Sequence, residues 1–396
     1  MNMKRKRDTL GRRIFIMFFA CPMIFLFLCQ SLFTQESLSI LKGPYLQNVT
    51  SNSIVIMWET NIQGTGSVIF RDMKGNTQIV TESKPKTIHE VLLSNLPSGL
   101  RFSYQVVTKT ESGAVKSQEY SFRTVPLKLE PWSFVVYGDT RSNPSIHSKV
   151  IDQILKEGEH KPAFLLHTGD LINNGSVYEC WDGDFFKPGK ELFAVTPLWP
   201  CLGNHEQNSE WYFKFFSLPN NERWYSFNYL NAHFIALDSY SDFKPKSEQY
   251  IWLGNDLKSC KSDWIFVFFH VPPYSVGRHN AVDEKGVPVE AEVKNSRLYL
   301  DPLFQKYKVD MVFNGHNHFY ERSLKEKVYY IVSGGGGATF HDKECINQYN
   351  QVFKRTYHYV VCDINGLNLK MYVKDIDGNI IDTLELTKSK MSTMPH

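Results

Sequence analysis

Several segments along the chain place carboxylate, amide and imidazole side chains close together, most of them beside a glycine. These segments are Gly138-Asp139, Gly169-Asp170, Gly203-Asn204-His205-Glu206, His270, and Gly315-His316-Asn317-His318. Such side chains are ligands for iron, manganese or zinc, whereas calcium prefers sites built from oxygen alone. Glycine lets the backbone turn sharply and approach another segment closely. The residue types therefore predict a transition-metal site.

Each of these segments follows a short apolar run that is typical of a buried strand. The predicted strands lie at 133–137, 163–167, 198–202, 233–237, 264–269, 309–313 and 328–332. Helices are predicted at 146–157, with Asn143 and Ser145 as candidate caps, and at 248–257 and 296–307. This alternation indicates an α/β layered domain over residues 131–396, with β-sheets flanked by helices. Because sites in such sheets form at the carboxyl ends of strands, distant residues are expected to meet in one pocket.

Residues 36–126 carry a different pattern, with short β-rich segments at 53–59, 66–71, 88–93 and 102–108 separated by turn residues. This pattern predicts an N-terminal all-β sandwich. The stretch resembles a fibronectin type III domain through Trp58 and the run from Leu96 to Tyr104, although both aromatic residues also suit an ordinary sandwich core. We assign no chemistry to this domain.

The N-terminal segment, residues 1–35, combines a basic stretch with an apolar run at 14–29. This layout predicts a secretory signal peptide, with an uncleaved membrane anchor as the alternative, because the apolar run is intermediate in length. The protein is therefore expected to be exported: periplasmic, secreted, or anchored and facing outward. Membrane contact is expected only through such an anchor. Five cysteines lie beyond this segment, and their pairing stays open.

The net charge of the chain is +3, but its first 13 residues hold six Lys or Arg and one Asp. The rest of the chain is therefore close to neutral, at about −2. A nucleic-acid-binding protein would carry a dense basic surface, so no nucleic-acid partner is expected. A small partner is expected instead, and the sequence leaves the oligomeric state open.

The ordered set of segments resembles the calcineurin-like metallophosphoesterase superfamily, and especially its purple acid phosphatase-like branch. The run from Gly315 to Arg322 (GHNHFYER) is similar to that branch's last motif, and a sandwich domain precedes the catalytic domain in both. The resemblance implies two metal ions, of iron, manganese or zinc. Carried over by motif, Asp139 and His318 would hold the first metal, Asp170 would bridge both, and Asn204, His270 and His316 would hold the second.

The resemblance also implies residues that act on the phosphate. His205 would protonate the leaving group or stabilise the transition state. Independently of the resemblance, Glu206 is a candidate to orient His205, although it also suits a plain surface carboxylate. His279 follows His270 by nine residues, as a phosphate-contacting histidine of the branch does, although it also suits a surface loop. Taken singly, the two aspartates could instead be turn formers and His270 a core histidine.

Two positions depart from the family pattern. Asn173 stands where the purple enzymes have the tyrosine that colours iron(III), and Arg141 stands where other branches have a metal-binding histidine. The first metal would then have three clear protein ligands and no strong colour. We predict that Arg141 instead binds the substrate phosphate, because a guanidinium suits two contacts to an oxyanion.

The resemblance, together with the predicted signal segment, implies an exported, binuclear-metal acid phosphatase that hydrolyses the phosphate monoester of a small phosphorylated substrate. Metal-activated hydroxide would attack phosphorus in line with the leaving group. The alternatives on the same metal site are a phosphodiesterase and a nucleotide hydrolase. A different class of protein, a non-catalytic cell-surface binding protein, is the further alternative.

Overall fold

The computed structural model describes residues 36–157 and 161–389. The segment 1–35, predicted to be a signal peptide or anchor, lies outside the described residues. Within the described ranges, no helix is both long and apolar enough to cross a membrane. The described residues from Leu38 onward belong to one compact unit.

Residues 40–123 form the predicted all-β sandwich. Its strands are β1 (Ile40–Gln47), β2 (Ile54–Asp72), β3 (Thr77–Thr81), β4 (Lys86–Leu93), β5 (Arg101–Thr110), β6 (Gly113–Lys116) and β7 (Tyr120–Arg123). The two predicted strands at 53–59 and 66–71 are one long strand, β2, which pairs with β1 and β4 in its first half and with β3 and β5 in its second. The pairing with β4 shifts between Glu59 and Gly64, so β2 passes from one sheet to the other. The fibronectin type III resemblance stays a prediction.

A side chain at Gly64 or Gly66 would obstruct this long strand. A Cβ at Gly64 would lie 2.8 Å from the Lys109 carbonyl oxygen, and one at Gly66 would lie 2.5 Å from the His89 ring. Both distances are too short for a real contact, so glycine is required where β2 crosses β5 and His89. Trp58, fully buried, stacks on His89 at 4.5 Å between ring centroids and anchors the sandwich core.

The second domain contains two further sheets. The first has the strand order β10-β9-β8-β18-β19-β20 and the second β11-β12-β13-β14-β16-β15-β17. Their strands are β8 (Trp132–Tyr137), β9 (Leu165–His167), β10 (Leu198–Pro200), β11 (Tyr225–Tyr229), β12 (Ala232–Ala236), β13 (Trp264–Phe268), β14 (Met311–Asn314), β15 (Tyr320–Lys325), β16 (Val328–Ser333), β17 (Asn350–Lys354), β18 (His358–Asn365), β19 (Asn368–Asp375) and β20 (Ile380–Thr387). Strands β8 to β10 are parallel, as are β12, β13, β14 and β16. The predicted α/β layered fold is therefore confirmed.

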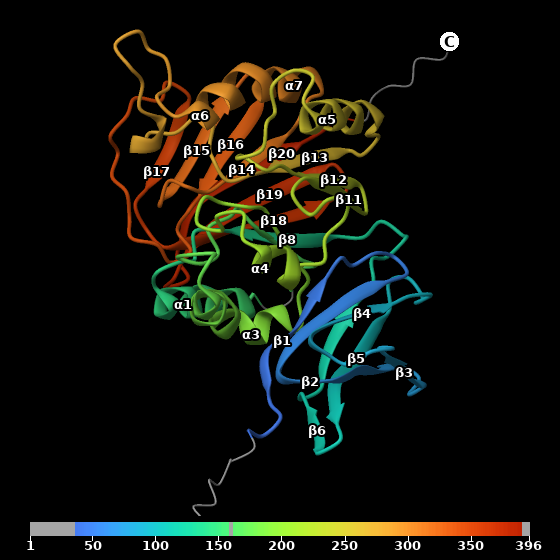
Figure 1. Cartoon of the computed structure of the whole chain (residues 1–396). Coiled ribbons are helices and arrows are strands. Elements are labelled where there is room, and N and C mark those ends of the chain that lie inside the picture. Colours follow the sequence, from blue (N-terminus) through green and yellow to red (C-terminus); the bar gives the residue numbers. More distant parts are fainter. Residues whose placement is uncertain (1–35, 158–160, 390–396) are drawn as a thin grey trace, which may run out of the picture. The chain divides into compact units, whose positions relative to one another are not determined.

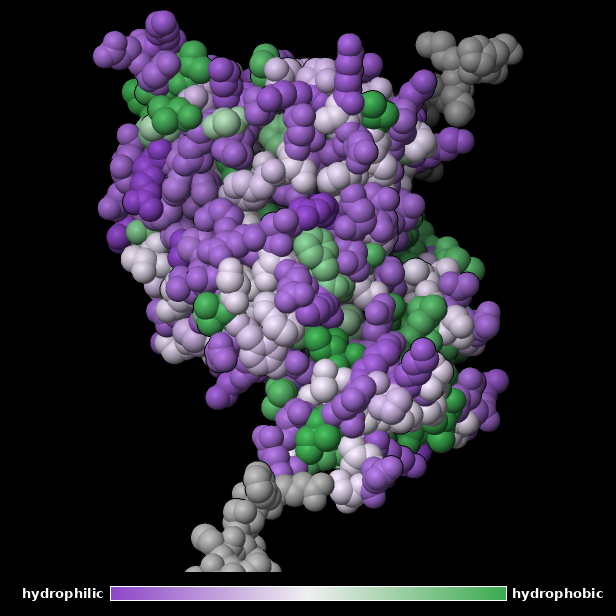
Figure 2. All heavy atoms as spheres, in the orientation of Figure 1, coloured by the Kyte–Doolittle hydropathy of each residue, from purple (hydrophilic) through white to green (hydrophobic). Residues whose placement is uncertain are grey.

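The two sheets pack face to face, and helices cover their outer faces (Figure 1). Phe134 of β8 packs against Phe234 of β12 and Phe266 of β13, with ring centroids 5.1 and 5.2 Å apart. Leu253 and Phe304, on the helices beyond the second sheet, are fully buried against its other face. Hydrophilic side chains cover most of the face seen in Figure 2, and hydrophobic ones form small separate areas. The apolar runs thus fill the space between the layers, as their sequence predicts.

The helical elements of this domain are short. They are α1 (Pro144–Leu155), α2 (Tyr178–Cys180), η1 (Trp181–Phe186), α3 (Lys187–Phe193), α4 (Glu210–Phe215), α5 (Glu248–Ser259), η2 (Arg278–Asn280), α6 (Ala291–Asn295), η3 (Ser296–Leu300) and α7 (Asp301–Lys306). The helix predicted at 296–307 is divided into the π-turn η3 and the helix α7, because Pro302 lacks the N–H that a continuous helix would use. Asn143 precedes α1 as predicted, but its side chain accepts a hydrogen bond from Ser145 and does not cap the helix.

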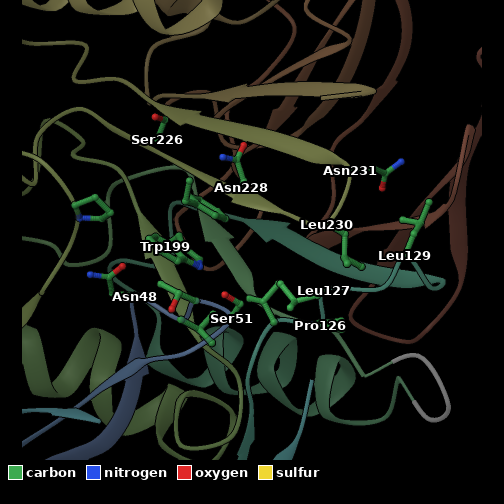
Figure 3. Close-up of a pocket in the computed structure, with 15 residues that line it drawn as sticks. Asn48, Ser51, Pro126, Leu127, Leu129, Trp199, Ser226, Asn228, Leu230 and Asn231 are labelled. Atoms are coloured by element: carbon green, nitrogen blue, oxygen red, sulfur yellow. The ribbon is translucent and has the colours of Figure 1, made fainter. Parts of the chain in front are cut away.

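Hydrogen bonds tie the sandwich to the second domain. The hydroxyl groups of Tyr45 and Tyr104 donate to the carbonyl oxygens of Phe215 and Ala194, at 2.8 and 2.7 Å. A hollow of about 570 Å³ lies at the same junction, lined by Asn48 and Ser51 of the sandwich, by the link at Pro126, Leu127 and Leu129, and by Trp199 and Leu230 beyond it (Figure 3). None of the predicted metal ligands lines this hollow.

A buried ion pair strengthens the junction. Lys42 Nζ lies 2.5 Å from Glu59 Oε2, and the two side chains are only 1% and 8% exposed. Tyr178, from the second domain, donates its hydroxyl to the same Glu59 oxygen at 2.7 Å, and the Lys42 ammonium lies 3.8 Å from the centre of the Tyr178 ring. Both charges are therefore compensated in a site that excludes water.

Replacing one partner of the Lys42–Glu59 pair should lower the free energy of unfolding far more than replacing both. Lys42→Met leaves the Glu59 carboxylate buried and unpaired, so the free energy of unfolding should fall by about 3–5 kcal/mol. Adding Glu59→Gln, which keeps an acceptor for Tyr178, should restore most of this loss. The control is Lys214→Met in the exposed Lys214–Glu210 pair, where a change below about 1 kcal/mol is expected. Urea unfolding followed by circular dichroism measures the stability of the three variants. Equal losses of unfolding free energy in Lys42→Met and Lys214→Met would contradict the interpretation.

Candidate metal centre

The predicted metal ligands lie just beyond the carboxyl ends of five parallel strands. Asp139 follows β8, Asp170 follows β9 and Asn204 follows β10, all in the first sheet of the second domain. His270 follows β13, and both His316 and His318 follow β14, in the facing sheet. Each sheet therefore contributes one half of the site, as the strand-end rule predicts.

Three of these side chains form a buried cluster. Ligand atoms of Asp139, Asp170 and His318 all lie within 4.8 Å of one another. His318 Nε2 is 3.4 Å from Asp139 Oδ1, and the exposed fractions of Asp139 and Asp170 are 0% and 1%. These are the residues predicted to surround the first metal, so the structure brings that set together.

The other three side chains meet beside this cluster. Asn204 Oδ1 lies 3.1 Å from both His270 Nε2 and His316 Nδ1, and the two ring nitrogens are 3.1 Å apart. His270 Nε2 is also 3.3 Å from Asp170 Oδ1. Asp170 thus adjoins both groups, which is the position expected of a bridging carboxylate.

Unusual backbone conformations aim these side chains inward. Asp139, Asp170 and His316 have φ values of +55°, +54° and +68°, which few residues other than glycine adopt. The His316 N–H donates to both oxygens of Asp139 at 3.1 Å. A Cβ at Gly203 would lie only 2.3 Å from Asp170 Oδ1, so a side chain there would displace the carboxylate.

Burial and neighbouring charges set the protonation of Asp170 and His316. Burial opposes ionisation of Asp170, but His270, His205 and Arg141 outweigh it and hold the pKa of this carboxyl well below its usual range. Burial lowers the pKa of His316 to about 4, so this imidazole stays neutral and keeps a lone pair available. Two buried carboxylates, an amide oxygen and three imidazoles in mutual contact fit a pair of transition-metal cations.

Comparison with known proteins agrees with this arrangement. Residues 133–320 match the model of the calcineurin-like phosphoesterase family. The second domain is a calcineurin-like phosphoesterase domain. The chain is 30% identical over 312 residues to probable purple acid phosphatase 20 of Arabidopsis thaliana, covering 73% of this chain and 64% of that protein. With purple acid phosphatase 13 of the same plant it shares 28% identity, over 71% of this chain and 60% of the relative.

A solved structure extends the likeness to the whole fold. The purple acid phosphatase PPD1 from yellow lupin (Lupinus luteus) superposes with a TM-score of 0.77 at 20% identity, over 88% of this chain and 75% of that one. The sandwich and the phosphoesterase domain therefore follow each other in an architecture that a purple acid phosphatase also has. The chain spans only about three fifths of the length of the two plant relatives.

His205 lies at the edge of the candidate metal site, with a side chain that is 25% exposed. Its Nδ1 donates to the carbonyl oxygen of Asn173 at 2.6 Å, which leaves Nε2 3.9 Å from Asp170 Oδ2. Glu206 does not orient this ring, contrary to our prediction. Its buried carboxylate accepts the backbone N–H groups of Gly203, Asp170 and Leu171, so it braces the loops that carry the ligands.

Arg141 reaches the buried cluster. Its Nε lies 3.1 Å from Asp170 Oδ2 and a terminal nitrogen lies 3.3 Å from His318 Nε2. The Asn173 side chain accepts a hydrogen bond from Ser142 at 2.9 Å and takes no part in the metal-ligand cluster. Phosphate binding by Arg141 stays a prediction, because in this structure its charge is directed to Asp170.

Sequence reasoning missed Glu290, which joins two residues of the site. Its carboxylate lies 2.6 Å from His279 Nδ1 and 3.2 Å from His316 Nε2. Burial opposes its charge, but the hydrogen bonds from His279 and His316 outweigh it and lower its pKa to about 2. The His279 and His316 rings are 3.9 Å apart, so the structure brings His279 to the site as predicted. Glu290 stands before a short helix in an acidic loop, where no spacing distinguishes it from its neighbours.

We expect Glu290→Gln to weaken substrate binding more than metal binding. His279 and His316 contact different carboxylate oxygens, and a glutamine keeps an oxygen at only one of these two positions. His279 should therefore lose its fixed orientation, and KM for a phosphate ester should rise about tenfold. The exposed Glu284, which makes no hydrogen bond or ion pair among the described residues, serves as the control through Glu284→Gln. Steady-state kinetics with metal analysis of each variant measures the effect. Loss of metal with an unchanged KM would contradict it.

Proposed function

We propose that this chain is an exported, metal-dependent phosphomonoesterase of the acid phosphatase type. The observation that carries the proposal is the convergence of Asp139, Asp170, Asn204, His270, His316 and His318 at the ends of five parallel strands. The family match of the second domain and the purple acid phosphatase relatives support the same class of reaction.

The six predicted ligands would hold two cations. Asp139 and His318 would hold one cation, Asn204, His270 and His316 the other, and Asp170 would bridge them. When bound, the two cations would supply an activated water and neutralise charge on the phosphoryl oxygens during in-line displacement. Iron, manganese and zinc all suit this donor set.

Three cationic or proton-bearing side chains surround this centre. The Nδ1–H of His205 is fixed on the Asn173 carbonyl oxygen, and as an imidazolium the ring would donate from Nε2 to the leaving oxygen. His279 is held by Glu290 beside His316 and would contact a phosphoryl oxygen. Arg141 would exchange part of its contact with Asp170 for the phosphate when Asp170 binds metal. Because Asn173 replaces the colour-giving tyrosine, we propose an enzyme without strong visible colour.

Activity should depend on metal and on two named residues. Chelation should abolish hydrolysis of nitrophenyl phosphate, and added Mn²⁺, Zn²⁺ or Fe²⁺ should restore it. Asp170→Asn should lower kcat at least about 10³-fold, and His205→Ala about 10²–10⁴-fold. Asp152→Asn, an exposed carboxylate on α1, is the matched control. Metal analysis and circular dichroism accompany the kinetics.

A folded Asp170→Asn variant with undiminished activity would refute the two-metal reaction, and a wild-type protein that binds metal but hydrolyses no ester would favour a binding protein.

The choice between mono- and diester substrates follows from the positive groups around the site. A monoester carries up to two negative charges and a diester one, so His205, His279 and Arg141 should favour the monoester. We expect kcat/KM for nitrophenyl phosphate to exceed that for bis(nitrophenyl) phosphate by at least about tenfold. A preference for the diester would instead support the phosphodiesterase alternative, and preference for a nucleoside triphosphate would support a nucleotide hydrolase.

A further inference from the structure

Arg278 lies at the rim of the phosphoesterase site. It opens the short helical turn η2, directly before His279, and its side chain is exposed. One terminal nitrogen lies 3.3 Å from His341 Nε2. Neither Arg278 nor His341 belongs to the set of residues that the family resemblance implies.

His341 connects Arg278 to the predicted first-metal cluster. The His341 ring stacks on His318, with centroids 3.8 Å apart and planes 24° apart. It also packs against His279 at 5.2 Å. His341 is only 9% exposed, so the imidazole that contacts Arg278 is itself fixed inside the site. The guanidinium is thus separated from a metal-ligand candidate by one ring.

The charge of Arg278 has no acidic partner among residues 36–157 and 161–389. A guanidinium can only donate, so His341 accepts through Nε2 in this contact. An imidazole supplies no negative charge, so this contact leaves the positive charge of Arg278 uncompensated.

We propose that Arg278 binds a second anionic group of the substrate, on the leaving-group side of the phosphate. This inference rests on the proposed phosphatase function and refines it. The preferred substrates are phosphate monoesters that also carry a carboxylate or a second phosphate. A guanidinium beside a buried ring suits either anion, because it can donate two parallel hydrogen bonds to a carboxylate or a phosphate.

The test uses two pairs of matched substrates. In 3-phosphoglycerate a carboxylate replaces the hydroxymethyl group of glycerol 3-phosphate, and fructose 1,6-bisphosphate adds a phosphate to fructose 6-phosphate. The wild-type enzyme should show kcat/KM roughly tenfold higher for the substrate with the extra anion in at least one pair. Which pair responds identifies the anion.

The variants assign this preference to Arg278. Arg278→Ala should bring the ratio within a pair close to one, Arg278→Lys should keep part of it, and hydrolysis of nitrophenyl phosphate should change less than about twofold. Lys343→Ala, an exposed cation two residues from His341, is the control and should keep the wild-type ratio.

Two results would overturn the proposal. One is a wild-type enzyme that hydrolyses nitrophenyl phosphate but shows no preference in either pair. The other is an Arg278→Ala variant that loses activity equally on both members of a pair, because Arg278 would then only position His341. A wild-type enzyme with no activity on any ester would instead refute the proposed function itself.

Discussion

The buried negative charge of Asp170 organises the centre of this molecule. Its carboxylate is almost fully enclosed, and His270, His205 and Arg141 all lie within ion-pair distance of it. A charge in such a place is very unfavourable unless other charges compensate it. The surrounding imidazoles and the guanidinium provide compensation in the structure described, and cations would provide more. The fold tolerates this residue because two sheets deliver its partners from opposite sides.

The loops that deliver those partners are held by backbone hydrogen bonds more than by side-chain packing. Glu206 accepts three N–H groups from two different loops, and burial and the neighbouring Asp170 raise the pKa of its carboxyl to about 7. The left-handed backbone at Asp139, Asp170 and His316 costs energy at each residue. The parallel strands and these hydrogen bonds together keep the costly conformations in place and hold the ligand side chains toward one another.

Much of this arrangement could be predicted from the sequence, because strand-end positions obey a simple geometric rule. The fold class and the meeting of all six predicted ligands follow from apolar runs that each end in a glycine or a polar residue. The strand-end rule does not predict side chains that reach the site from other loops. Glu290 and His341 reach the site from loops whose paths depend on tertiary packing, and Glu206 turned toward backbone N–H groups instead of His205. Likewise, the strands predicted at 53–59 and 66–71 form the single strand β2, because glycines that interrupt a sequence pattern can continue one strand in space.

The junction at Glu59 has a consequence for how this protein can be altered. Tyr178 binds Glu59 of the sandwich and belongs to the same loop region as Asn173, whose carbonyl oxygen fixes His205. The N-terminal sandwich contributes no predicted ligand, but it supports the loop that forms one wall of the candidate site. Truncations or domain exchanges that cut between the two halves would leave that wall without its support, so the natural unit for engineering is the pair of domains.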